Sequence, residues 1–306
     1  MSEPNIAILL ASYNGDRYIE KQIESILAQS FSNWKIYIHD DGSKDKTMDV
    51  INSYTLKYPD KIKYVEGPST GGAKSNFFFL LNKVEADFYL FCDQDDYWLE
   101  DKIEKTYSTL KKIDNPNKPA LVFTDLKIVD SNLNVIADKM SVYQKLVCDK
   151  LTLNKILVQN YVTGCTMMIN RNLREMMIKC QDYSKVIMHD WWAAIIAAKY
   201  GNILFLDEST ILYRQHGDNS VGAKQMNLKN GINKFRYQKR DMKDSIMLTR
   251  LQAQEFKNVY ELHEDDFVSI YADLLNKNKL QRVFSFFKYG FWKSTFMRNI
   301  GYVIFG

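Results

Sequence analysis

The first 113 residues alternate short, nearly continuous apolar runs with longer segments in which apolar residues recur at helical spacing. The short runs are typical of strands buried on both faces, and the helical spacing is typical of amphipathic helices. This alternation predicts βαβ units, and therefore an α/β fold with a mostly parallel central sheet and flanking helices. The predicted strands are 6–11, 34–38, 62–65 and 88–92, and the predicted helices are 16–29, 46–58, 73–84 and 99–113.

Beyond Pro119 the pattern becomes mixed. Residues 191–200 predict a short apolar helix that follows Asp190 and has Gly201 at its C-cap position, where glycine is favoured. From residue 223 onward the chain is helical and basic in pattern. We therefore predict an α/β domain over residues 1–222 and a helical C-terminal region over residues 223–306. The further predicted strands are 120–129, 133–137, 161–169 (interrupted by Gly164), 203–206 and 210–213.

Polar clusters follow three of the predicted strands, at residues 12–15, 39–43 and 93–96. Right-handed crossovers would bring the carboxyl ends of these strands, where ligands bind in α/β sheets, to one edge. Asp93, Asp95 and Asp96 lie within four residues, and their carboxylates would repel one another unless a cation lay between them. A divalent cation that also binds phosphate oxygens fits this density of oxygen ligands. The alternative is a solvated acidic turn.

Four further positions are candidates for chemistry. Asp41, with Asp40, could accept hydrogen bonds from a nucleotide base or ribose, or could belong to an ordinary turn. Lys74 follows two glycines at the head of a helix and could face phosphates, or could be a solvated lysine. Asp190 lies beside two tryptophans, where burial would raise its pKa as a general base requires; otherwise it is an N-cap. His216, in a polar loop, could bind a metal or a phosphate, or neither.

The composition narrows the class of protein. Of the 306 residues 46% are hydrophobic, enough for one large domain or a domain with an appendage. A net charge of only +4 gives no reason to expect a nucleic-acid partner. The four cysteines form no CxxC pair, which predicts reduced thiols. Neither a signal peptide nor an apolar run long enough to span a membrane is recognisable, so we expect a cytoplasmic protein.

The polar clusters, in their order along residues 5–222, resemble the motifs of the inverting glycosyltransferases of family 2, which have the GT-A fold. Two of these motifs, at residues 93–98 and 213–219, look most like those of the bacterial rhamnosyltransferase-like branch. The enzymes of that branch build O-antigen, capsule or cell-wall polysaccharide. That branch often has proline where this chain has Glu100. The matching motifs are Ala11-Ser12-Tyr13-Asn14-Gly15, His39-Asp40-Asp41-Gly42-Ser43, Asp93-Gln94-Asp95-Asp96, His189-Asp190-Trp191-Trp192 and Tyr213-Arg214-Gln215-His216-Gly217-Asp218-Asn219.

The resemblance implies an enzyme that moves a sugar from a nucleotide to a hydroxyl of a cell-surface polysaccharide or a lipid-linked oligosaccharide. Rhamnose from dTDP-rhamnose is favoured, and a UDP-hexose is the alternative. Mn²⁺ or Mg²⁺ would stabilise the departing nucleoside diphosphate, and Asp190 would be the catalytic base. The candidate ligands of the nucleotide sugar are Ala11, Tyr13, Asn14, Asp41, Lys74 and Asp93, and those of the metal are Asp93, Asp95, Asp96 and His216.

The end of the chain suggests where the acceptor resides. The last 33 residues contain six lysines or arginines, no acids and many aromatics. Such a segment could lie on the anionic inner face of the cell membrane, where lipid-linked acceptors are found. Alternatively, its aromatics pack against the domain or against the second subunit of a homodimer. The residues concerned are Lys288, Lys293, Arg298, Phe286, Phe287, Phe291, Trp292 and Phe296.

Other functions have weaker support in the sequence. The chain lacks GxGxxG after its first strand and lacks GxxxxGK[ST], which counts against a dinucleotide oxidoreductase and a P-loop nucleotidase. It also lacks the glycine-rich activating loop expected of a sugar-nucleotide nucleotidyltransferase. A non-catalytic protein that binds nucleotide sugars through the same fold remains the alternative from another class.

Overall fold

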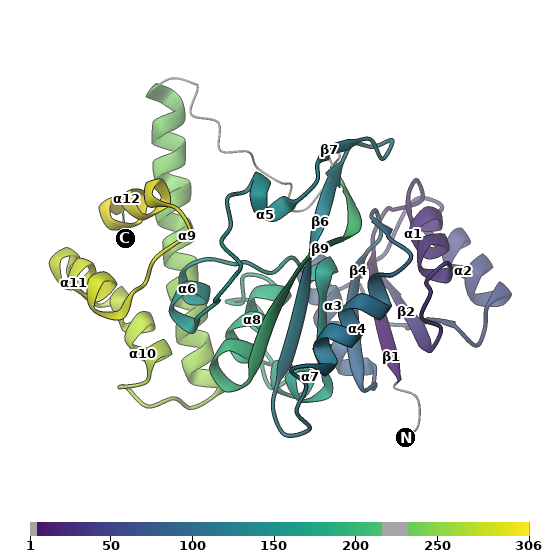
Figure 1. The fold of residues 1–306 in the computed structure, drawn as a ribbon, viewed down its shortest axis with the longest axis horizontal. Helices are drawn as coiled ribbons and strands as arrows, with labels where there is room; N and C mark the ends of the chain where they lie inside the picture. The colour runs from purple at the N-terminus through teal and green to yellow at the C-terminus, as the bar shows by residue number, and fades with distance from the viewer. Residues whose placement is uncertain (1–4, 216–231, 306) are drawn as a thin grey trace.

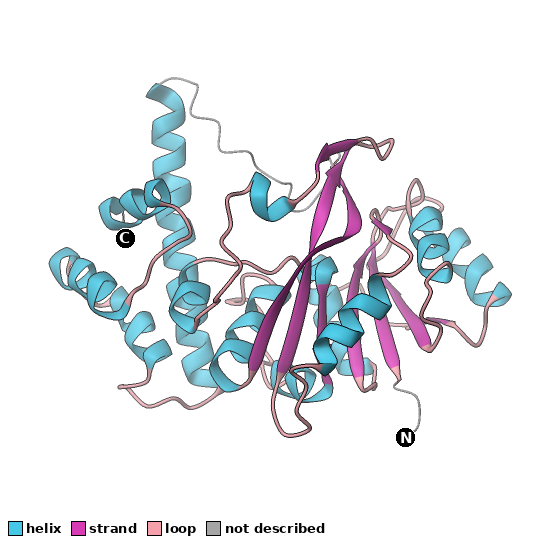
Figure 2. Cartoon of the chain, viewed as in Figure 1, coloured by secondary structure: helices cyan, strands magenta, loops and turns pink. Residues whose placement is uncertain are grey.

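The computed structural model of the chain describes residues 5–215 and 232–305, and it centres on a mixed β-sheet flanked by helices (Figure 1, Figure 2). The strands are β1 (Ile6–Ser12), β2 (Trp34–Asp40), β3 (Ile62–Tyr64), β4 (Phe88–Asp93), β5 (Tyr97–Trp98), β6 (Ala120–Val129), β7 (Val135–Ala137), β8 (Met167–Asn170) and β9 (Asn202–Arg214). The α-helices are α1 (Ile19–Leu27), α2 (Thr47–Lys57), α3 (Ala73–Lys83), α4 (Lys102–Lys111), α5 (Met140–Tyr143), α6 (Leu153–Val158), α7 (Arg171–Met177), α8 (His189–Tyr200), α9 (Ile232–Val259), α10 (Phe267–Ala272), α11 (Lys279–Tyr289) and α12 (Phe296–Phe305).

The first half of the sheet has the predicted parallel arrangement. β3, β2, β1 and β4 lie in this order, and each pairs in parallel with its neighbour. Every residue of β1 is buried, because its alternate side chains enter two different cores. Leu9 packs in the core under α3 and α8, whereas Ile8 packs in the core under α1, α2 and α4.

The second half of the sheet is not parallel throughout, so the prediction of a mostly parallel sheet is corrected to a mixed one. β8 pairs antiparallel with both β4 and β6, and β5 pairs antiparallel with β9. Only β6 and β9 pair in parallel in this half among the described residues. The direction of each neighbour depends on long-range pairing, which a local pattern of apolar residues does not contain.

Two local predictions need correction, and a third is confirmed. The strand predicted over 161–169 is confined to β8, because residues Gly164–Thr166 form a 3₁₀ turn. The strands predicted over 203–206 and 210–213 are one strand, β9, whose register against β6 shifts midway. Gly201 is the C-cap residue of α8, as predicted, and its φ is −152°. A Cβ there would lie 1.8 Å from the Pro119 carbonyl oxygen, so close approach explains the glycine.

The C-terminal helices share a core with the sheet domain. Phe256 of α9 is fully buried and packs against Trp192 of α8, with ring centroids 5.1 Å apart. Figure 1 shows α10, α11 and α12 beside α9, at the end of the molecule away from α1 and α2. No helix in the described ranges is both long and apolar enough to cross a membrane. The predicted boundary at residues 222 and 223 falls outside the described residues and stays a prediction. All four cysteines are buried and free.

Candidate active site

Three polar turns meet at one edge of the sheet, as the sequence predicted. β1 pairs with β2 on one side and with β4 on the other. Ala11 therefore lies opposite both His39 and Asp93, and Ser12 lies opposite Asp40. The turns that follow the three strands begin at the same level of the sheet.

The turn after β1 is fastened to both of its neighbours. The Tyr13 amide donates to Oε1 of Gln94 at 2.9 Å, and Nε2 of Gln94 donates back to the Tyr13 carbonyl at 2.8 Å. A Cβ on Gly15 would lie 2.1 Å from Oε1 of Gln94, so glycine makes room for this pair. Asn14 adopts a positive φ of 46°, and its amide donates to the Ser43 hydroxyl at 2.7 Å. The side chain of Tyr13 is 54% exposed and accessible to a ligand.

The carboxylate of Asp40, in the turn after β2, is fully engaged in hydrogen bonds that stabilise this turn. Its carboxylate accepts hydrogen bonds from the Ser12 hydroxyl at 2.9 Å and from the Ser43 hydroxyl at 2.6 Å. The amides of Gly42 and Ser43 also donate to it, at 3.1 and 2.7 Å. Of the two acids considered for base or ribose contacts, Asp40 therefore has a structural role.

Asp41 is also buried, and it accepts hydrogen bonds from the loop before α3. Thr70 donates its amide and its hydroxyl, and the amides of Gly71 and Gly72 donate at 3.2 and 2.6 Å. Positive φ angles of 84° and 132° at these glycines let both amides reach the carboxylate. Burial alone would raise the pKa of Asp41, but the hydrogen bonds from Thr70, Gly72 and Gly71 outweigh burial and lower it. A contact of Asp41 with a nucleotide base stays a prediction.

The acids after β4 are in a different environment. Asp96 is fully buried; its Oδ1 accepts from the Arg214 amide at 3.2 Å, and its Oδ2 has no hydrogen-bond partner among the described residues. Burial, with the charges of Asp95 and Asp93, raises the pKa of Asp96 well above its ordinary value. Burial, with the charges of Asp95 and Asp190, raises the pKa of the half-buried Asp93 to about 7.

Two cationic side chains that the sequence reasoning missed lie beside this acid cluster. Arg214, at the end of β9, donates its Nε to the Asp95 carbonyl at 2.8 Å. Lys102 is fully buried in the first turn of α4, with its ammonium 4.6 Å from the centre of the Trp98 ring and without a hydrogen-bond partner in the described structure. Burial lowers the pKa of Lys102 to about 8, although the charge of Asp96 opposes this shift. The sequence signal that could have identified Lys102 is its position on the buried face of a helix directly after an acidic motif.

Asp190 is held by three hydrogen-bond donors in the first turn of α8. Its Oδ1 accepts from the Asn160 side chain at 3.1 Å and from the Trp191 amide at 2.6 Å, and its Oδ2 accepts from the Gly164 amide at 3.0 Å. The N-cap of α8 is Met188, so Asp190 is not the helix cap that was its alternative interpretation. Burial raises the pKa of Asp190 to about 6, although the three hydrogen bonds lower it.

Gly164 allows the loop before β8 to approach the start of α8. A Cβ at this position would lie 2.6 Å from Nε2 of His189. The buried His189 ring packs against Phe77 and Phe91, with centroid distances of 4.3 and 5.1 Å, and burial lowers its pKa to about 3. Sequence reasoning noticed Gly164 only as the interruption of a strand, yet the interruption is the turn that donates to Asp190. Asn160 gave no local signal.

Lys74, another candidate, makes its hydrogen bonds outside the acid cluster. Lys74 donates its ammonium to the carbonyls of Tyr183 and Val186 at 2.7 and 2.6 Å, on the loop that leads into α8. Burial lowers the pKa of Lys74. His216 lies outside the described residues, so its role as a metal ligand stays a prediction.

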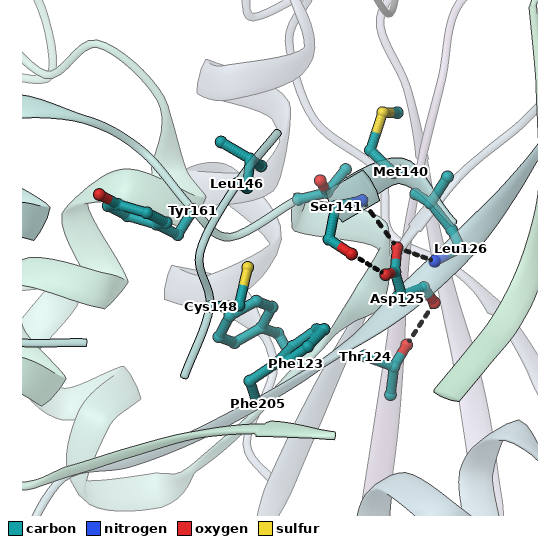
Figure 3. Close-up of a pocket in the computed structure, with 11 residues that line it drawn as sticks. Phe123, Thr124, Asp125, Leu126, Met140, Ser141, Leu146, Cys148, Tyr161 and Phe205 are labelled. Carbon is teal, nitrogen blue, oxygen red and sulfur yellow. Dashed lines mark hydrogen bonds between the residues drawn. The ribbon is translucent and has the colours of Figure 1, made fainter. Parts of the chain in front are cut away.

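A small hollow beside the Asn160 loop has no room for a substrate. It lies between β6, β9 and α5, and Tyr161 is among the residues that line it (Figure 3). Within it, Asp125 accepts hydrogen bonds from the amides of Leu126 and Ser141 at 2.9 and 3.2 Å, which fastens α5 to β6 (Figure 3). Its cavity volume of about 10 Å³ holds about one water molecule.

The acid cluster offers carboxylate oxygens that could contribute to binding a divalent cation. Asp93, Asp96 and Cys165 each place one possible ligand atom within 4.8 Å of the others. The buried Oδ2 of Asp96 has no partner in the described structure, and mutual repulsion contributes to the raised pKa of both acids. A bound cation would supply the missing partner and relieve this repulsion.

The sequence and the fold agree with known glycosyltransferases. A dTDP-rhamnosyl transferase, RfbG of Shigella flexneri, is 32% identical over 226 residues, which are 70% of this chain and 74% of that protein. An uncharacterized glycosyltransferase of Rickettsia typhi, RT0329, is 28% identical over 219 residues. That match covers 70% of this chain but only 64% of the Rickettsia protein, so the chain spans less than two thirds of that relative.

Two solved structures show the same fold at low sequence identity. S. aureus TarS 1-349 in complex with UDP-GlcNAc has a TM-score of 0.56 at 19% identity, over 92% of this chain and 73% of that one. The mannosyltransferase PcManGT from Pyrobaculum calidifontis in complex with GDP-Man and Mn²⁺ has a TM-score of 0.54 at 14% identity, over 90% of this chain and 71% of that one. These likenesses confirm the predicted GT-A fold. The model of the family described as Glycosyl transferase family 2 matches residues 7–175, and the chain belongs to this glycosyltransferase family.

Proposed function

We propose that this glycosyltransferase is inverting, uses a nucleotide-sugar donor and depends on a divalent metal. The observation that carries the proposal is the combination of an acid cluster, in which one buried oxygen of Asp96 has no hydrogen-bond partner in the described structure, with a separate buried carboxyl at Asp190. The charge of Asp190 contributes to the raised pKa of Asp93, so the two groups are within electrostatic reach. The nucleotide sugars in the TarS and PcManGT complexes support a donor of this class.

Asp190 has the setting of a general base. With its pKa raised to about 6, most of the carboxylate is ionised at neutral pH and can still take a proton from a hydroxyl. Asn160, Trp191 and Gly164 fix its two oxygens in place. In the proposed step, the acceptor hydroxyl oxygen bonds to the anomeric carbon, the bond from that carbon to the diphosphate breaks, and the proton passes to Asp190. One displacement inverts the anomeric configuration.

The donor would lie across the edge formed by β1, β2 and β4. We assign the nucleotide to the turns that carry Ala11, Tyr13, Asn14 and Asp41, and the diphosphate to the side of Asp93. Asp93, Asp95, Asp96 and His216 would hold Mn²⁺ or Mg²⁺, which would stabilise the charge of the leaving diphosphate. Lys74 would reach the phosphates only after releasing the two carbonyls that it now contacts.

We propose dTDP-rhamnose as the donor sugar nucleotide, because RfbG, at 32% identity, is named a dTDP-rhamnosyl transferase. A UDP-hexose is the alternative, since the TarS complex contains UDP-GlcNAc. The proposed acceptor is a hydroxyl of a growing cell-surface polysaccharide, such as O-antigen or capsule, or of a lipid-linked oligosaccharide. A thermal-shift comparison of nucleotide sugars with Mn²⁺ tests the donor, because the bound donor stabilises the native state.

The decisive variant is Asp190→Asn. We expect kcat to fall by about 10²- to 10⁴-fold because the base is lost, while donor binding measured by calorimetry changes little. Asp149→Asn, at an exposed aspartate, is the matched control and should keep full turnover. Unimpaired turnover by Asp190→Asn would remove this residue from the mechanism. Product NMR that showed retention of the anomeric configuration would overturn the single displacement.

A further inference from the structure

The last two helices expose an unusual amount of apolar surface. Leu280, Phe284 and Phe287 are 82%, 66% and 68% exposed, and their spacing places them on one face of α11. On α12, four apolar side chains are exposed at helical spacing. They are Phe296, Met297, Ile300 and Ile304. Exposed apolar residues gathered on one face of a helix mark an interaction surface rather than ordinary surface composition.

The exposure of these side chains does not result from poor packing of the two helices. Phe286, next to the exposed pair on α11, is fully buried and stacks on Tyr302 of α12 with ring centroids 4.6 Å apart. Phe291, between the helices, is also fully buried. The helices therefore already have an apolar face directed into the protein, and the exposed face is a second one. Of the aromatics that the sequence grouped together, only Phe287 and Phe296 are exposed.

Within residues 274–306 all the side-chain charges have one sign. Residues 274–306 contain six lysines or arginines and no acid. Lys279 and Lys288 are exposed on α11, and Lys277, also exposed, pairs with Asp273 at 2.8 Å. Leu280 and Phe284 line a shallow surface hollow together with Lys277, Gln281 and Ser285. A second copy of this face would bring cations against cations, whereas an anionic lipid surface is complementary to both its apolar and its charged groups.

The surface is connected to the candidate base. The Ser294 amide, between α11 and α12, donates to Oε1 of Gln159 at 3.0 Å, and its hydroxyl donates to the Tyr161 hydroxyl at 3.2 Å. The residue between these two contacts is Asn160, which donates to Asp190. The segment that joins the two exposed helices therefore supports the loop that donates a hydrogen bond to Asp190.

We propose that the exposed apolar faces of α11 and α12, with the flanking lysines, dock the protein on an anionic phospholipid bilayer. The docking itself does not depend on the sugar chemistry. Its purpose, to present Asp190 to acceptors carried on lipid, rests on the proposed function. Aromatic and leucine side chains would enter the acyl boundary, while Lys279 and Lys288 remain at the level of the phosphates.

The test is flotation of the full-length protein with phosphatidylcholine vesicles that contain or lack phosphatidylglycerol. We expect flotation with the anionic vesicles only, weakened by salt, and lowered at least tenfold in apparent partitioning by Phe284→Glu with Phe287→Glu. Lys279→Gln with Lys288→Gln should lower it about tenfold or more. Leu56→Glu, at a residue of α2 that is 83% exposed, is the matched control and should float normally.

Donor binding and thermal unfolding of the same variants separate this proposal from the proposed function. Both should stay unchanged, since all of the substituted side chains are exposed. Absence of flotation by the wild type would overturn the docking proposal while leaving the transferase proposal intact. So would a stable dimer in sedimentation that Phe284→Glu with Phe287→Glu dissociates, because the apolar face would then cover a second copy.

Discussion

Two acidic turns lie at the same edge of the sheet, and their carboxylates differ in how many hydrogen bonds they accept and in the direction in which their pKa values shift. In the turn after β2, Asp40 and Asp41 each accept several hydrogen bonds, and in Asp41 these lower the pKa despite burial. In the turn after β4, burial and mutual repulsion raise the pKa of Asp93 and Asp96, and one oxygen of Asp96 has no partner in the described structure.

The difference separates acids that build the site from acids that are available to a ligand. A buried carboxylate supplied with N–H and O–H donors stabilises its own turn and needs nothing further. A buried carboxylate without them costs free energy until a proton or a cation arrives. Both turns are rich in aspartate in the sequence, which already predicted the metal site after β4. The surrounding donors add the physical distinction, because they satisfy Asp40 and Asp41 but leave one oxygen of Asp96 without a partner in the described structure.

The largest effect is expected from Asp40→Ala. The substitution leaves the donors on Ser12 and Ser43 without their acceptor inside a buried turn. We expect the free energy of unfolding to fall by about 4 kcal/mol in chemical denaturation, because hydrogen bonds to charged groups contribute about 1.5–3 kcal/mol each and are not additive. Asp60→Ala, at an exposed aspartate, should change it by less than about 0.5 kcal/mol. A loss as small as that of the control would show that Asp40 does not hold the turn.

The second-largest effect is expected in how the stability of the metal-free protein depends on pH. The pKa values of Asp93 and Asp190 are raised to about 7 and about 6, so the folded state keeps protons that the unfolded state releases near pH 4. Stability should therefore decrease as the pH rises from 4 to 7, by on the order of 3 kcal/mol after allowance for solvent screening. Denaturation curves across this range, with Asp93→Asn as the variant that flattens them, provide the measurement.

Mn²⁺ should reduce that pH dependence, because the cation replaces the protons on the same carboxylates. The rise in melting temperature on adding Mn²⁺ should be larger at pH 7.5 than at pH 5.5. Equal shifts at both values would mean that the cation binds away from these acids.

The same substitution, Asp→Asn, should change the stability in opposite directions in the two turns. Asp96→Asn removes a buried carboxylate that has one oxygen without a partner and is repelled by its acidic neighbours, so the metal-free protein at pH 8 should gain about 1 kcal/mol while Mn²⁺ binds at least about tenfold more weakly. Asp41→Asn removes a charge that is hydrogen-bonded, so stability should fall by about 2 kcal/mol. Thermal unfolding with and without Mn²⁺ measures both. Destabilisation by Asp96→Asn to the same extent would remove the contrast between the turns.

The smallest effect is expected where the turns are joined. Gln94→Ala breaks the two hydrogen bonds to the Tyr13 backbone and should cost about 1 kcal/mol in the free energy of unfolding. Donor affinity should weaken with it, because the turn after β1 would no longer be fixed against the acid cluster. Gln181→Ala, at an exposed glutamine outside the cluster, is the control for side-chain truncation. Unchanged affinity in Gln94→Ala would indicate that the turns are positioned independently.

The sequence by itself determined the elements and the edge at which the chemistry lies. Short continuous apolar runs that end in a polar turn, such as that of β4, are typical of central strands, so their carboxyl ends and the acids that follow them were predictable. The position of Asp190 at the start of an apolar helix was equally local. These features depend on residues that are close in sequence.

The tertiary structure decided what each acid is able to do. Asn160, Gly164 and Arg214 contact acids from which they are 26 to 118 positions distant in sequence, so no local pattern could pair them. β8 lies between β4 and β6 and pairs antiparallel with both, which makes the sheet mixed. This pairing places Cys165 and Gly164, which precede β8, beside the acids. Protonation and free coordination sites depend on burial and on donors from distant segments, and both exist only once the chain has folded.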